Sequence, residues 1–98
     1  MNFSEVISSF INGATEGCSG TRSNPGNLKI VEDRLVHYDT TIMERTTNRL
    51  ILNLSQYSIQ TGRLQKLIKS MINEDECDTV YKVPRDYHGS LTAFIVNK

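Results

Sequence analysis

Four short segments with strand character follow one another closely, and their spacing constrains the fold more than any other feature. They span residues 27–31, 35–38, 40–47 and 49–55, and they either alternate apolar with polar residues or are rich in β-branched ones. Glu32 and Asp33 directly follow the first segment and have the length of a two-residue hairpin connection. Because a parallel crossover needs about a dozen residues or more, these segments predict an antiparallel β-meander.

Two segments with helical periodicity flank this region. In the first, apolar residues recur at positions 3, 6, 7, 10 and 11, and Asn2 and Glu5 have the spacing of a capping box. In the second, over 57–73, apolar residues recur at 64, 67, 68, 71 and 72, with Ser58 or Thr61 as the cap. Both patterns predict short amphipathic helices, each of which needs a surface to cover.

The last part of the chain offers two more strand candidates, residues 79–83 and 91–96, separated by the turn-like segment 84–90. The order of elements is then helix, meander, helix and hairpin. We therefore expect an α+β fold in which two amphipathic helices pack on one face of an antiparallel β-meander sheet. Its 98 residues are expected to form a single domain over positions 1–98.

The segment GCSGTRSNPGN, residues 17–27, lies between the first predicted helix and the first predicted strand. Its glycines and hydroxyls resemble those of an anion-binding loop, but such loops normally run from a strand into a helix, and neither GK[ST] nor GxGxxG is present. Nucleotide hydrolysis is therefore not expected. We expect an ordinary connection, with contact of Arg22 and Ser23 to a partner or a nucleic-acid backbone as the alternative.

Charge is unevenly distributed although the net charge is zero. Residues 22–73 carry eight Lys or Arg against four Asp or Glu, and an acidic run follows at 74–78. On the second predicted helix, Arg63, Lys66 and Lys69 lie opposite the apolar stripe. This face is either solvated or a contact surface for phosphates or an acidic partner.

Residues that could support catalysis or bind metal are few. His37 lies in a predicted strand and His88 in a predicted turn, and no spacing pairs either of them with Cys18 or Cys77 as a nucleophile. The same four residues lack the short paired spacing of a structural zinc site. The acidic run at 74–78 lacks the alternating ligands of a calcium loop. We expect no catalytic residues, no metal and no cofactor.

The sequence has no basic and apolar leader and no apolar run long enough for a membrane helix. We therefore expect a cytoplasmic protein that does not contact a membrane. Both cysteines are expected to be free thiols. Exposed edge strands make a homodimer an open alternative.

Two motifs, HYDTTIMER and ILNLSQYSIQTGRLQ, carry a resemblance to a known group of proteins. The region 26–68 resembles a SYxTxIAxR…ILNxxxYSxTTxxxQ module of small uncharacterised proteins from phages and plasmids of low-GC Gram-positive bacteria. Met43 departs from the pattern where it has a small residue, and Gln60 departs where it has a hydroxyl. The matching residues are Tyr38, Thr40, Ile42, Arg45, Asn53, Tyr57, Ser58, Thr61 and Gln65.

The resemblance implies a mobile-element origin, and this suggests a non-enzymatic protein that binds a host component. Our leading expectation is an inhibitor of a host defence or nucleic-acid-processing complex, similar in action to anti-CRISPR proteins. A direct DNA- or RNA-binding module that uses the basic helix is the second expectation, and an enzyme built around His37 or His88 is the third. The expected contact residues are Arg22, Ser23, Arg45, Thr61, Arg63, Gln65, Lys66 and Lys69.

Overall fold

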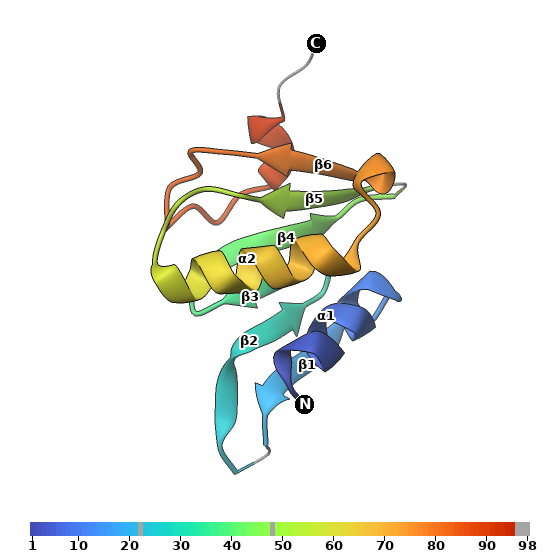
Figure 1. The fold of residues 1–98 in the computed structure, drawn as a ribbon, viewed down its shortest axis with the longest axis vertical. Helices are drawn as coiled ribbons and strands as arrows, with labels where there is room; N and C mark the ends of the chain where they lie inside the picture. The colour runs from blue at the N-terminus through green and yellow to red at the C-terminus, as the bar shows by residue number, and fades with distance from the viewer. Residues whose placement is uncertain (22, 48, 96–98) are drawn as a thin grey trace.

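The computed structural model describes residues 1–21, 23–47 and 49–95, and these form a six-stranded sheet with two α-helices (Figure 1). The strands lie side by side in chain order, β1 to β6. The fold is α+β, as expected, and the sheet is mixed but mostly antiparallel. In chain order the elements are α1 (Phe3–Ile11), β1 (Glu16–Gly20), β2 (Pro25–Val31), β3 (Arg34–His37), β4 (Thr40–Arg45), β5 (Leu50–Asn53), α2 (Ile59–Met71), the 3₁₀ helix η1 (Glu74–Glu76), β6 (Cys77–Val80) and the 3₁₀ helix η2 (Leu91–Phe94).

Helix α1 begins with the predicted capping box. The backbone N–H of Glu5 donates to Asn2 Oδ1 at 2.8 Å, and the backbone N–H of Asn2 donates to Glu5 Oε1 at 2.9 Å. These bonds satisfy N–H groups that have no partner inside the helix. The apolar stripe buries Val6, Ile7 and Phe10, so the helix is held by tertiary packing, as its short length requires.

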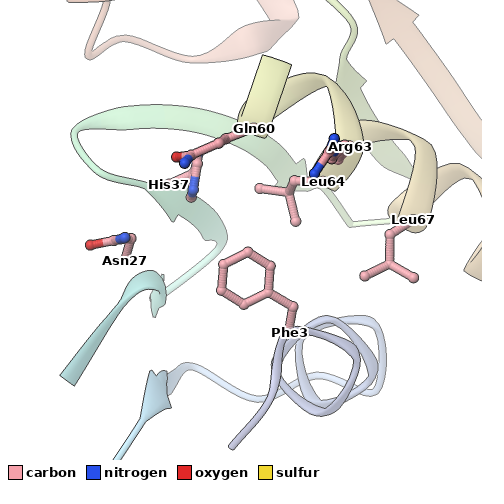
Figure 2. A pocket seen from close by; sticks show the side chains of 7 residues that line it. All are labelled: Phe3, Asn27, His37, Gln60, Arg63, Leu64 and Leu67. Carbon is pink, nitrogen blue, oxygen red and sulfur yellow. The ribbon is translucent and has the colours of Figure 1, made fainter. Parts of the chain in front are cut away.

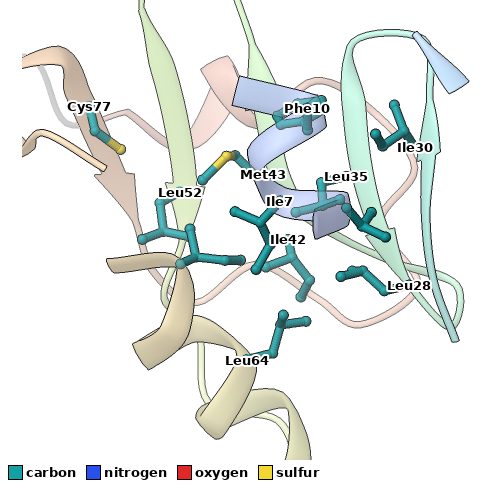
Figure 3. Packing of buried hydrophobic residues seen from close by; sticks show 12 residues of the cluster. Ile7, Phe10, Leu28, Ile30, Leu35, Ile42, Met43, Leu52, Leu64 and Cys77 are labelled. Carbon is teal, nitrogen blue, oxygen red and sulfur yellow. The ribbon is translucent and has the colours of Figure 1, made fainter. Parts of the chain in front are cut away.

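The main core lies where α1 and α2 meet the sheet (Figure 3). Burying one such aliphatic or aromatic side chain completely contributes about 1.5–3 kcal/mol, so this cluster is the principal source of stability. Met43 occupies part of it. Its buried members are Val6, Ile7, Phe10, Leu28, Ile30, Leu35, Ile42, Met43, Leu52, Leu64, Ile68 and Cys77.

The segment 17–27 is a β-hairpin, and the prediction of a simple connection was wrong. Residues Glu16–Gly20 form β1, which pairs antiparallel with β2. The strand was missed because it has no apolar alternation. Gly20 has a φ of +82°, and a Cβ there would approach the backbone of Asn24 and Gly26 to 2.5 Å. Glycine at position 20 therefore allows the close turn between the two strands.

Strand β6 pairs parallel with β5, which corrects the prediction of a wholly antiparallel sheet. Helix α2 lies between these two strands in the chain and provides the length that a parallel crossover needs. The strand predicted at 79–83 is shifted to Cys77–Val80. Asp78, from the acidic run, thus lies in the sheet, where its carboxylate accepts from Arg49 Nε at 2.9 Å.

Residues 91–96 were predicted as a strand, but Leu91–Phe94 form the 3₁₀ helix η2. Leu91 belongs to a second buried cluster with Ile51, Val80 and Val83. Since neighbouring residues of a strand point to opposite faces, Ile51 and Leu52 place the two clusters on opposite faces of β5. This burial and the capping of η2 override the strand propensity of the segment.

Candidate functional site

The outer face of α2 carries the basic residues that the sequence predicted. Ser58 caps the helix by accepting from the N–H of Thr61 at 3.2 Å. Leu64 and Ile68 are buried against the sheet. Three exposed residues, Arg63, Lys66 and Lys69, form what we call the basic face. Within the described part of the chain, none of their side chains has a hydrogen-bond or ion-pair partner.

Thr61 and Gln65, two of the expected contact residues, point inward instead. Gln65 is 7 % exposed, and its Nε2 donates to the carbonyl oxygens of Asn53 at 2.7 Å and Ser55 at 2.9 Å. Thr61 is 6 % exposed, and its Oγ1 lies 3.2 Å from His37 Nδ1. Both residues fasten α2 to the sheet, so they offer little surface to a partner.

Arg45 is likewise committed to internal contacts. Its guanidinium donates to the carbonyl oxygens of Phe10, Ala14 and Glu32 and lies 3.4 Å from the carboxylate of Asp33. It also lies over the Phe10 ring, 4.7 Å from the centroid. Arg45 therefore joins the end of α1 to the turn between β2 and β3, and it is not part of an open contact surface.

The two expected contact residues of the β1–β2 hairpin stand apart from the basic face. Ser23 is exposed near the end of this hairpin, and its Oγ lies 3.4 Å from Thr21 Oγ1. Figure 1 shows the hairpin extending away from α2. Arg22 lies outside the described residues. The structure thus gives no common surface to Ser23 and the basic face.

A cavity of about 380 Å³ lies beside the first turns of α2 (Figure 2). Phe3, Leu64 and Leu67 form its apolar wall, and the Phe3 ring points from α1 toward the space below Leu64. Polar side chains complete the lining, with Arg63 of the basic face among them. These are Asn27 from β2, His37 from β3, and Gln60 and Arg63 from α2.

His37 also lines this cavity, and it is only 3 % exposed. Its ring makes edge contacts with Phe3 and Tyr38, with centroids 6.0 and 4.7 Å apart. Burial lowers the pKa of His37 below its ordinary value of 6.5. The imidazole is therefore neutral at pH 7, where one ring nitrogen donates a hydrogen bond and the other accepts one.

The remaining sequence candidates for chemistry are dispersed. His88 is exposed, and its carbonyl oxygen accepts from Arg34 at 2.7 Å. Among the described residues, no three His, Cys, Asp or Glu side chains are grouped so as to hold a metal ion. Cys18 and Cys77 are both thiols and are not joined in a disulfide.

The cavity was missed in the sequence because its lining comes from four separate elements, and no local pattern connects them. Phe3 was assigned only to the apolar stripe of α1, and Asn27 and Gln60 carry no motif. In a comparison with known proteins, no family model, no curated protein and no solved structure matches the chain. Over the described residues, no helix is both long and apolar enough to span a membrane.

Proposed function

We propose that this chain is a non-enzymatic binding protein whose contact surface is the basic face of α2. One observation carries the proposal: within the described residues, the arginines of the sheet region have acidic partners, whereas the cations of α2 have none. Arg34, Arg45 and Arg49 contact Glu44, Asp33 and Asp78, respectively. Helix α2 contains no acidic residue, so its positive charge is directed at solvent or at a partner.

The partner should present carboxylates or phosphates, because such groups complement an unpaired row of cations. The resemblance of residues 26–68 to a phage and plasmid module supports a host target. We therefore propose an inhibitor of a host defence or nucleic-acid-processing complex, acting in the cytoplasm of the host by occupying an acidic surface of that complex.

Direct binding to DNA or RNA is the second candidate function, and the spacing of the basic face supports it. Arg63 and Lys69 are six residues apart, about 9 Å along the helix axis. Phosphates of one strand recur about every 3.4 Å along a duplex axis, so the basic face matches a run of about three phosphates. Binding of this kind weakens steeply as the salt concentration rises, since each phosphate contact releases counterions.

A double charge reversal, Lys66→Glu with Lys69→Glu, tests the contact surface. The wild-type protein and the variant are each used to capture partners from an extract of a low-GC Gram-positive host, and bare DNA and RNA are titrated in parallel. We expect the variant to bind the partner at least tenfold more weakly than the wild-type protein does. Lys29→Glu, at an exposed lysine of β2 outside the basic face, is the matched control and should keep it.

The two candidate functions give different results in these assays. The direct-binding function is supported if the wild-type protein binds bare nucleic acid in a salt-dependent way and the double variant does not bind it. Loss of one protein partner with no binding of bare nucleic acid supports the inhibitor. If the double variant retains every interaction of the wild-type protein, the basic face is only solvated, and the proposal is wrong.

A further inference from the structure

The polar lining of the cavity beside α2 combines hydrogen-bond donors with acceptors. The amides of Asn27 and Gln60 each carry both, and the neutral imidazole of His37 adds one nitrogen, because its other nitrogen lies at Thr61. Asn27 uses one N–H for the hydroxyl of Tyr38 at 2.9 Å, which leaves its carbonyl oxygen available. Within the described chain, the side-chain amide of Gln60 has no hydrogen-bond partner, and the Nε2 atom of His37 has none either.

The rest of the lining favours a flat apolar body joined to an anion. Phe3, Leu64 and Leu67 provide the apolar wall, and an aromatic ring such as Phe3 is a stacking surface. Arg63 is exposed and lines the cavity, and within the described residues its guanidinium has no hydrogen-bond or ion-pair partner. Guanidinium groups bind phosphate through paired N–H donors. A volume of about 380 Å³ is near the lower limit for small-ligand sites.

We infer that this cavity binds a nucleobase that carries a 5′-phosphate, with the base against Phe3 and the phosphate at Arg63. A simple carboxylate would need only donors. The edge of a nucleobase presents donors and acceptors side by side, and this matches the lining residues Asn27, His37 and Gln60. The ligand is either a free mononucleotide or one nucleotide of a single strand. This inference does not depend on a protein partner for the basic face.

The site is tested by titrating the isotope-labelled full chain with AMP, GMP, CMP and UMP and following the NMR signals of His37 and the Gln60 amide. We expect saturable shifts of both signals with at least one mononucleotide. Its nucleoside should bind roughly tenfold more weakly, the effect of one charge-assisted hydrogen bond. Absence of saturable shifts with all four nucleotides, or shifts with inorganic phosphate alone, would overturn the inference.

Two exposed side chains allow the contacts to be separated without disturbing the core. Arg63→Gln should make the nucleotide and its nucleoside bind with equal affinity. Gln60→Ala should lower the affinity for both of them by several fold. Lys29→Gln, which also removes one exposed positive charge but lies outside the cavity, should change neither. If Arg63→Gln leaves the nucleotide-to-nucleoside ratio unchanged, the phosphate does not contact Arg63, and the assignment is wrong.

A short single-stranded oligonucleotide distinguishes the two sources of the ligand. If the oligonucleotide displaces the bound mononucleotide, the His37 and Gln60 signals shift again. If its affinity also falls steeply as the salt concentration rises, nucleotides of the strand enter the cavity. If it leaves those signals unchanged, the ligand is the free mononucleotide. His37 and Gln60 also line a neighbouring cavity with Arg85, whereas Phe3 and Leu67 line this one and not its neighbour. The Leu67 methyl signals, followed in the same titrations, must therefore shift together with those of His37 and Gln60. A negative result here is distinguishable from failure of the basic face to capture a partner.

Discussion

The backbone N–H of Leu91 donates to the carboxylate of Glu44 at 2.9 Å, a contact between residues 47 positions apart in the chain. The same carboxylate accepts from the hydroxyl of Ser90 at 2.6 Å, and Glu44 is only 8 % exposed. Glu44 thus anchors the start of η2 to β4. This explains how the C-terminal segment is held against the face of the sheet opposite to the main core.

Replacing Glu44 by Ala should loosen this segment. The change leaves the N–H of Leu91 and the hydroxyl of Ser90 without their acceptor, which costs about 1–3 kcal/mol of unfolding free energy. Urea denaturation measures the loss, and hydrogen exchange should become faster at Leu91 than at core residues such as Leu52. If the substitution accelerates hydrogen exchange equally at Leu91 and Leu52, Glu44 does not anchor this segment.

Replacing Gln65 by Leu should destabilise the protein by about 1–3 kcal/mol, because the carbonyl oxygens of Asn53 and Ser55 lose their buried donor. Gln60→Leu on the same helix is the matched control. Gln60 is exposed, so its replacement should change the unfolding free energy by less than about 0.5 kcal/mol. Equal midpoints for the two variants in urea would show that the Gln65 bonds contribute nothing.

Arg45→Lys should also destabilise the fold, by about 1–3 kcal/mol, although the charge is kept. A lysine ammonium cannot reproduce the planar fork that serves the carbonyl oxygens of Phe10, Ala14 and Glu32 together. Arg63→Lys, on the exposed basic face, should leave stability unchanged. Thermal unfolding of the two variants makes the comparison, and an unaltered melting temperature for Arg45→Lys would refute the role given to the guanidinium.

Stability should depend on the protonation of His37. Burial lowers its pKa in the folded state below 6.5, so the unfolded chain binds the proton more readily. The stabilising contribution is therefore present above pH 6.5 and is lost as the pH falls through the folded-state pKa. Urea denaturation at several pH values, compared with His37→Gln, isolates this contribution. The wild-type protein should lose more unfolding free energy on acidification than the variant. If the unfolding free energy of both proteins falls in parallel with pH, His37 makes no such contribution.

The elements that the sequence predicted correctly are those with local patterns. The capping box of Asn2 and Glu5 marked α1, and the two-residue connection at Glu32 and Asp33 marked the hairpin of β2 with β3. Strand β1 was missed because it lacks apolar alternation, although it pairs with its neighbour β2. The errors at η2 and β6 arise from distant contacts. The conformation of η2 depends on Glu44 and a second core, and the direction of β6 depends on how α2 crosses the sheet.

The same distinction applies to the candidate site. Arg63, Lys66 and Lys69 were predicted to share the outer face of the helix because helical periodicity is local, and they are exposed there. Arg45 and Gln65 were expected at a contact surface. Their partners are backbone carbonyl oxygens that only the folded chain brings near.

The parallel pairing of β5 with β6 also implies an order of folding. The pairs from β1 to β5 connect neighbouring segments and can close through short loops, whereas β6 can join only after the intervening chain has been brought across the sheet. The meander can therefore form before β6 pairs with it. We expect α2 and its basic face to be fixed last, when β6 takes its place at the edge of a sheet that already exists.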